Sequence, residues 1–244
     1  MRMRRRGLGL GLALAAVLLS VGSAKAATIP YGLTITDGTQ TDTLANITGL
    51  YTYTPNSTGG SYVLNGPVGL QVFMLNSWSS TYALDPFVTN NFNITNTTSS
   101  TQTFLVTVTS PVSPALASPT QLNGSIALAL TNGNTSSGAT LGSSAPNAVY
   151  TALIDGGSIQ TLLNNPYALS CTGTGCSNSS NTSFGPISGP GVNSSIGITI
   201  QFTLTPGASA GVTSAFNVVP EPATLALVGV GVLALVAVGR RQNR

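Results

Sequence analysis

Residues 103–109 read Thr-Phe-Leu-Val-Thr-Val-Thr, and this stretch decides the fold class. Successive side chains of an extended strand point to opposite faces, so Phe104, Val106 and Val108 share one face. Threonines occupy the other face, with Leu105 the exception. One apolar and one polar face are typical of a strand that packs on a core with one side only. The stretch therefore predicts an antiparallel β-sheet.

The same alternation returns near the end of the chain. In Ile198–Leu204 the apolar side chains are predicted to point inward, and the intervening threonines and Gln201 outward. Asp155-Gly156-Gly157 lies between two candidate strands and favours a tight hairpin. Short apolar or alternating segments between turn clusters predict these strands: Leu33–Thr36, Leu44–Thr54, Ser61–Leu64, Leu70–Leu75, Phe87–Thr95, Thr101–Thr109, Ser125–Thr131, Ala148–Ile154, Ser158–Leu163, Ile196–Leu204 and Gly211–Val218.

This pattern predicts one all-β ectodomain, residues 27–218, built as an antiparallel two-layer β-sandwich of Greek-key or jelly-roll type. The absence of an internal repeat disfavours a solenoid or propeller. Three segments rich in turn residues are expected to remain loops: Ser110–Thr120, Asn132–Asn147 and Ser170–Ser195. The stretch Gly207–Val219 is expected to lead out of the last strand.

The first 26 residues have the features of a secretory signal peptide. Four arginines lie within residues 1–6, residues 7–22 are apolar, and Ala24-Lys25-Ala26 fits a small-x-small cleavage site. Arg5-Arg6 raises the twin-arginine route as an alternative. The leucine-rich apolar segment favours the general secretion machinery.

Positive charge is confined to the two ends of the chain. All eight basic residues lie in residues 1–25 and 240–244, whereas residues 27–219 hold four aspartates and no Lys, Arg or His. Nucleic-acid binding depends on Lys and Arg that neutralise phosphates, so we expect none. Electrostatic capture of an anionic polysaccharide is excluded for the same reason.

The C-terminal segment, residues 219–244, has three parts. Pro220-Glu221-Pro222 is expected to stay extended, because proline fixes φ and lacks an N–H donor. Residues 223–239 carry no charge and predict one transmembrane helix near the short limit for crossing a bilayer. The basic residues Arg240, Arg241 and Arg244 are expected to hold the end of the chain in the cytoplasm. An alternative is a plain single-pass anchor.

This order of motif, apolar helix and basic end resembles the PEP-CTERM sorting signal of Gram-negative and related bacteria. The resemblance implies an exported precursor, held transiently in the inner membrane and processed by an exosortase, a membrane-embedded cysteine protease. It further implies a mature protein at the cell surface or outside the cell, in the company of exopolysaccharide. The passages Phe92–Thr109 and Gln201–Val218 are similar to PEP-CTERM β-sandwich ectodomains in pattern only.

Cys171 and Cys176 are the only cysteines. In an exported chain, two cysteines this close predict one local disulfide. Metal binding would need further thiol or imidazole ligands, and a redox pair would need Cys-x-x-Cys spacing.

Catalytic residues are scarce. The chain has no histidine, which excludes Ser-His-Asp and Cys-His catalysis and removes the usual zinc ligands. Asp37, Asp85 and Asp155 lie in turn dipeptides, and only Asp42 does not. We therefore expect a non-catalytic protein without metal or cofactor. A two-aspartate hydrolase and a calcium ion shared by Asp37 and Asp42 are weaker alternatives.

Two alternatives for the ectodomain involve sugars. Tyr51, Tyr53 and Trp78 are candidate contacts for a neutral glycan, although aromatic residues in sheets commonly fill the core instead. Glycosylation is the other alternative, and the candidate acceptors are Asn46, Asn56, Asn93, Asn96, Asn123, Asn134, Asn178, Asn181 and Asn193. Both stand beside the main expectation of an exported structural or interaction protein.

Overall fold

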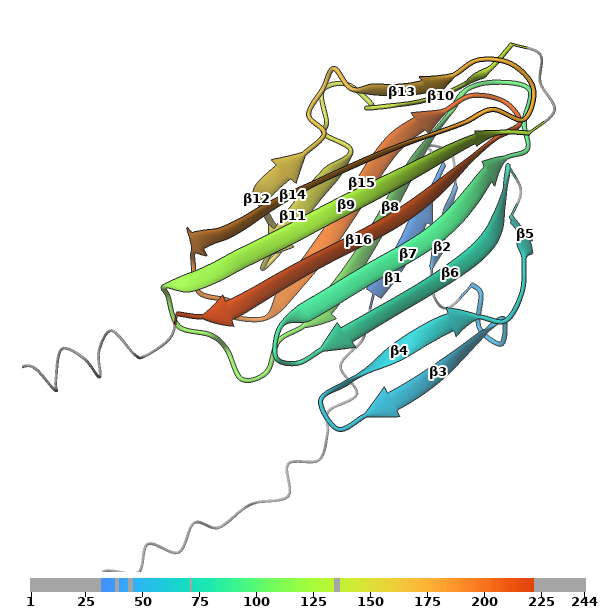
Figure 1. Ribbon diagram of the computed structural model, residues 1–244. Coiled ribbons are helices and arrows are strands. Elements are labelled where there is room, and N and C mark those ends of the chain that lie inside the picture. Colours follow the sequence, from blue (N-terminus) through green and yellow to red (C-terminus); the bar gives the residue numbers. More distant parts are fainter. Residues whose placement is uncertain (1–31, 38–39, 44–45, 71, 134–136, 222–244) are drawn as a thin grey trace, which may run out of the picture.

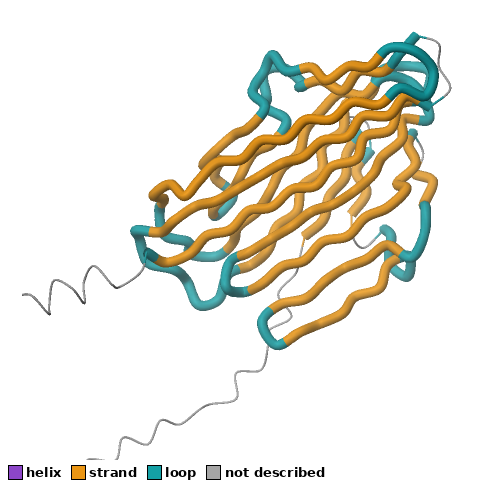
Figure 2. The backbone as a smooth tube through the Cα atoms, in the orientation of Figure 1, coloured by secondary structure: helices purple, strands orange, loops and turns teal. Residues whose placement is uncertain are grey.

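The computed structural model describes residues 32–37, 40–43, 46–70, 72–133 and 137–221. These residues form strands and connecting loops, and none of them is helical (Figure 2). The strands build two antiparallel sheets that pack face to face (Figure 1). The prediction of an all-β, antiparallel sandwich is therefore confirmed.

The first sheet, sheet A, has a continuous path of six strands with a small ribbon at one corner. Along the path the order is β12 (Gly157–Leu162), β11 (Tyr150–Ile154), β15 (Ser195–Leu204), β8 (Gln102–Pro111), β1 (Gly32–Thr36) and β2 (Thr41–Thr43). The ribbon consists of β10 (Ala139–Gly142) and β13 (Ala168–Cys171), and β10 also pairs with the end of β15.

The second sheet, sheet B, is broader and carries the longest strands. Its order is β14 (Ser177–Gly189), β9 (Thr120–Asn132), β16 (Ala208–Pro220), β7 (Phe87–Asn96), β6 (Phe73–Ala83), β4 (Gly59–Leu64) and β3 (Tyr51–Asn56). The short β5 (Val68–Leu70) pairs with β6. Hairpin β3–β4 lies at one edge of the sheet and β14 at the other (Figure 1).

The two strands with the clearest alternation form the middle of sheet A. β8 and β15 pair over ten residues, from Gln102↔Leu204 to Pro111↔Ser195. Phe104 and Phe202 are both fully buried, with ring centroids 5.6 Å apart. Phe202 also stacks on Phe92 of β7 at 6.3 Å, and this contact joins the two sheets. The predicted inward faces of these strands are therefore confirmed.

The Asp-Gly hairpin is also confirmed. β11 and β12 are joined by the two residues Asp155 and Gly156, which have φ angles of 50° and 80°. A turn with two positive φ angles matches the twist of the flanking strands, and Asp-Gly is a favoured sequence for it. Gly156 has open space around its Cα, so the backbone conformation rather than crowding requires glycine here.

Several predicted loops are strands. β10 lies within the predicted loop Asn132–Asn147, and β14, with the end of β13, lies within Ser170–Ser195. β14 is polar and largely exposed, and it pairs only with β9, so ladder hydrogen bonds rather than apolar alternation define it. The predicted strand Leu44–Thr54 is also corrected, because residues 46–49 form a turn and β3 begins at Tyr51.

The end of the ectodomain differs from prediction as well. The predicted strand Gly211–Val218 is confirmed as part of β16, but Gly207–Val219 does not lead out of the sandwich, because nearly all of it belongs to β16, between β9 and β7. Ala208, Ala210 and Ser214 are buried at 0–1% exposure. Small side chains such as Ala208 and Ala210 carry a weak hydrophobic signal, so the start of this strand is hard to recognise from sequence.

A disulfide joins Cys171 and Cys176, with Cα atoms 5.8 Å apart, as predicted. Cys171 ends β13 of sheet A, and Cys176 precedes β14 of sheet B. The bond therefore links the two sheets at one corner. Because the closed loop is so short, the disulfide is expected to contribute only about 2 kcal/mol to the free energy of unfolding.

Three predicted segments lie outside the described residues. They are the signal peptide 1–26 with Ala24 and Ala26, the helix 223–239 with the preceding Pro222, and the basic end with Arg240, Arg241 and Arg244. Within the described part of the chain, no helix has the length and apolar character that crossing a bilayer requires.

Candidate functional site

The outer face of sheet B is uncharged and lined by small side chains. The residues that point away from the core on β9 and β16 include Ala127, Ala129 and Gly211. The registers place Gly211 opposite Ala129 on one side and opposite Asn93 on the other. A strip without long side chains therefore runs along the middle of this face.

Polar side chains border this strip on both sides. Ser179 and Asn181 of β14 lie on one side, and Asn91 and Asn93 of β7 lie on the other. Together with the strip they line a surface hollow of about 690 Å³, here called the sheet B groove. A second hollow of about 310 Å³, which includes Ser125 of β9, lies further along the same strands.

The amides beside the groove are held by one another. Asn76 donates to the Oδ1 of Asn93 at 2.6 Å and to the hydroxyl of Thr95 at 2.7 Å. The hydroxyl of Thr95 is 2.5 Å from that of Ser209 on β16. These bonds fix the side chains of three neighbouring strands, so the polar border of the groove is preorganised.

An aromatic cluster lies at the β3–β4 edge of the same sheet. Tyr53 stacks on Tyr62 with centroids 4.6 Å apart, and Tyr62 stacks on Tyr82 at 6.2 Å. The hydroxyls of Tyr53 and Tyr82 are 2.8 Å apart. Burial, followed by the neighbouring Tyr53 and Tyr51, raises the pKa of Tyr62 to about 12. The side chain of Tyr62 is therefore neutral at ordinary pH.

The three candidate glycan contacts differ in exposure. Tyr51 and Tyr53 share a face of β3, and Tyr53 is 41% exposed. Trp78 is only 2% exposed, and its indole N–H donates to the Oδ1 of buried Asn90 at 3.0 Å. Trp78 is therefore removed from the candidate glycan contacts, because its ring is part of the core and offers no face to a sugar.

Of the candidate glycosylation sites, Asn96 is fully buried. Its amide donates to the backbone oxygens of Ser100 and Leu204 at 2.8 and 2.9 Å. A folded domain cannot present this side chain to a transferase.

The two aspartates considered for calcium lie close in the chain. Asp37 is 5% exposed, and its Oδ1 accepts the N–H of Gln40 at 2.8 Å. Burial, and then the charge of Asp37, raise the pKa of Asp42 in β2. Among the described residues, no group of three or more metal-ligating side chains is present.

The carboxylate of Asp155 accepts several hydrogen bonds. Its oxygens accept the backbone N–H groups of Asn193, Ser194 and Ser195 at 2.7–3.1 Å, and two side-chain bonds from the same segment add to these. Burial opposes ionisation, but these bonds outweigh it and hold the pKa of Asp155 well below its ordinary value. Asp155 thus ties the β11–β12 turn to the start of β15.

Replacement of Asp155 by alanine is expected to destabilise the fold by about 1–2 kcal/mol at neutral pH, because charge-assisted bonds to backbone donors are lost and solvent screening at this exposed position reduces their contribution. A lowered folded-state pKa stabilises the protein above the unfolded value of about 3.9, and this contribution declines as pH falls below it. Urea unfolding of wild type and variant should therefore give a difference that shrinks at acidic pH.

Asp85→Ala is the matched control for this prediction, because Asp85 is an exposed residue of the β6–β7 turn. It should change stability by less than about 0.5 kcal/mol. If the difference in unfolding free energy between wild type and Asp155→Ala stayed constant down to pH 2.5, the lowered pKa of Asp155 would be contradicted.

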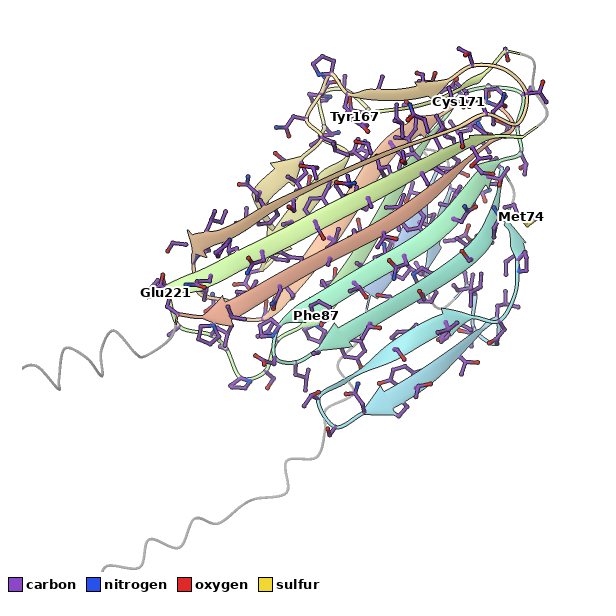
Figure 3. The ribbon with its side chains drawn as sticks, viewed as in Figure 1. Met74, Phe87, Tyr167, Cys171 and Glu221 are labelled. Atoms are coloured by element: carbon purple, nitrogen blue, oxygen red, sulfur yellow. A yellow bond between two sulfur atoms is a disulfide. The ribbon has the colours of Figure 1, made fainter. Side chains whose placement is uncertain are left out.

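The last described residues bring the predicted sorting motif against the sandwich. β16 includes Pro220, which lies opposite Thr120 of β9. Glu221 follows at the end of the sandwich where β16 stops (Figure 3). Its backbone N–H is 3.4 Å from the oxygen of Pro119, and its carboxylate is 3.5 Å from the hydroxyl of Ser188 on β14.

Comparison with known proteins identifies this end of the chain. No curated protein matches the sequence. Among solved structures, the chain is similar to one titled "Structure of infectious bursal disease virus Gx strain", with 14% identity and a TM-score of 0.28. That match covers 79% of this chain and 56% of the viral chain. Residues 218–242 match the family model of the PEP-CTERM protein-sorting motif, so the chain carries this motif at its C-terminal end.

Proposed function

We propose that this chain is a non-catalytic, exported protein of the cell surface or extracellular matrix that associates with exopolysaccharide. The observation that carries the proposal is the sorting motif at residues 218–242. The motif implies an exported, membrane-anchored precursor that an exosortase processes. Its C-terminal position leaves the sandwich as the part that acts outside the membrane.

The absence of catalysis is proposed from the chemistry of the chain. Residues 27–219 contain no imidazole, amine or guanidinium group. General acid–base work near neutral pH would therefore fall on the four aspartates. Asp155 is committed to the backbone of residues 193–195, and Asp37 to Gln40. Neither is free to act as a base without breaking these bonds.

The intact mass of the protein from its native host tests the proposal. We expect a mature form that lacks residues 1–26 and the segment C-terminal to the motif. The proposal would be overturned if the whole-chain mass were found in a catalytically active protein of the cytoplasm. Added mass in hexose steps would show that the mature protein is glycosylated.

Recognition of a neutral glycan is the second candidate function, and the sheet B groove favours it. The groove combines a floor of Ala127, Ala129 and Gly211 with amide and hydroxyl borders, and no charged side chain lines it. Neutral sugars offer hydroxyls that pair with such groups without the cost of burying a charge.

Native gels that contain dextran or laminarin would measure this binding as retardation. Ala127→Phe, which fills the floor, should abolish the retardation, whereas Thr81→Phe on the same face outside the groove should not. Loss of binding in Tyr53→Ala alone would move the contact to the aromatic cluster. Unretarded wild-type protein would remove this candidate.

A further inference from the structure

The sorting motif begins inside a strand of the sandwich. The family match starts at Val218, which is fully buried and donates its N–H to the oxygen of Pro86 at 2.9 Å. Val219 and Pro220 still lie opposite Gln121 and Thr120 of β9. The folded domain and the motif therefore share residues, and no flexible spacer separates them.

The partner of this strand end is itself firmly held. Thr120 is fully buried, and its hydroxyl donates to the oxygen of Pro190 at 2.6 Å. The contacts of Glu221 are much longer, at 3.4 and 3.5 Å, which is the upper limit for a hydrogen bond. Because the N–H of Val218 points to Pro86 beside β7, the alternating pattern directs Val219 and Glu221 toward β9, whereas Pro220, which lacks an N–H, points away from it. The end of the strand beyond Val219 is therefore weakly held, through the long contacts of Glu221.

A protease binds its substrate as an extended chain, largely through main-chain N–H and C=O groups. In the folded ectodomain, β7 pairs with β16 as far as Asn217, and β9 competes for these main-chain groups as far as Pro220. Only Val219 separates the buried Val218 from Pro220. A processing enzyme that binds Glu221 while Val218 stays buried must bind within about 10 Å of the sandwich, because each extended residue spans roughly 3.3 Å.

We propose that Val219–Glu221 must unpair from β9 and leave Ser188 before the sorting enzyme can process the chain. This inference rests on the proposed exosortase processing. Ser188 and the Pro119–Gln121 segment act as positioning residues that hold the motif against the sandwich. Local opening of a strand end needs far less free energy than global unfolding, so the motif becomes available while the sandwich stays folded.

A disulfide between the two strands tests the inference in the full-length chain expressed in its host. Val219→Cys with Gln121→Cys pairs directly opposite residues of β16 and β9 and prevents the strand end from opening. Thr213→Cys with Ala127→Cys is the matched control. Thr213 and Ala127 also lie opposite each other, with their side chains on the same outer face. Because Thr213 is an even number of residues from Val219, both pairs are hydrogen-bonded pairs of the β16–β9 ladder.

We expect the Val219/Gln121 variant to accumulate as a precursor that retains residues 222–244, with loss of the mature form, while the control variant is processed. Mass spectrometry detects both the engineered disulfide (the staple) and the C-terminus of the protein. Processing of the stapled chain at the rate of the control would overturn the inference. Absence of processing in the wild type would instead overturn the proposed function.

An insertion provides a second measurement if the staple does not form. Gly-Ser-Gly-Ser placed between Val219 and Pro220 moves the motif away from β9 and Ser188. We expect faster appearance of the mature form in a pulse-chase experiment. An unchanged rate would show that the strand end does not limit access.

Discussion

A chain that ends at Gly207 should fail to fold, although it keeps every strand except β16. β16 pairs with β9 over thirteen residues and with β7 over nine, and it separates two halves of sheet B. Its inward side chains, among them Val212, Phe216 and Val218, are buried at 0–3% exposure. Each buried large side chain contributes roughly 1.5–3 kcal/mol. Their sum approaches a typical stability of about 5–15 kcal/mol, before any loss of pairing is counted.

The matched control is a chain that ends at Glu221, which keeps all of β16. It should melt cooperatively, whereas the shorter chain should show no cooperative transition by circular dichroism. Trypsin cannot report the difference, because no Lys or Arg lies between residues 26 and 239. Thermolysin should digest only the shorter chain rapidly. A cooperative melt of the shorter chain would show that β16 is dispensable.

Strands with strong apolar alternation could be predicted from sequence. β8 and β15 were identified because one face carries Phe, Val, Ile or Leu at nearly every second position. The Asp155-Gly156 turn could be predicted because its backbone conformation depends on two residues only. These signals are local, so tertiary context is not needed to read them.

Other strand segments depend on pairing that the sequence does not display. The second half of β6 buries Ser80 at 1% exposure between Trp78 and Tyr82, and its hydroxyl donates to the oxygen of Thr89. A polar residue on the inner face interrupts the hydrophobic pattern. β14 has almost no buried side chain and exists through its ladder with β9.

The candidate sites divide in the same way. The sorting motif could be found because its parts follow each other within one short segment. The sheet B groove could not, because Ala127, Gly211 and Asn93 are ordinary residues far apart in the chain. Their joint position depends on the strand order β9-β16-β7, which no local pattern encodes. The sequence leaves Trp78 open between a core and a binding surface, because aromatic residues fit both, and the structure places it in the core.

The same chain that ends at Glu221 should fold but lose its sorting. Residues 222–244 contain the uncharged segment and the basic end that the motif requires, and none of β16 lies beyond Pro220. A deletion that began at Val219 would also remove paired strand residues and would mix misfolding with missorting. The stop after Glu221 separates the two effects.

We expect this truncated protein to be exported without a membrane-bound precursor and to be recovered entirely in the soluble fraction. Glu221→Gln in the full-length chain is the complementary variant, because Glu221 is the only charged residue between Asp155 and Arg240. Loss of this carboxylate should leave an anchored, unprocessed precursor, since the predicted transmembrane segment is retained. Cell fractionation with immunoblotting distinguishes the three forms. Identical distribution and size of the full-length, truncated and Glu221→Gln proteins would show that the motif has no part in the fate of this chain.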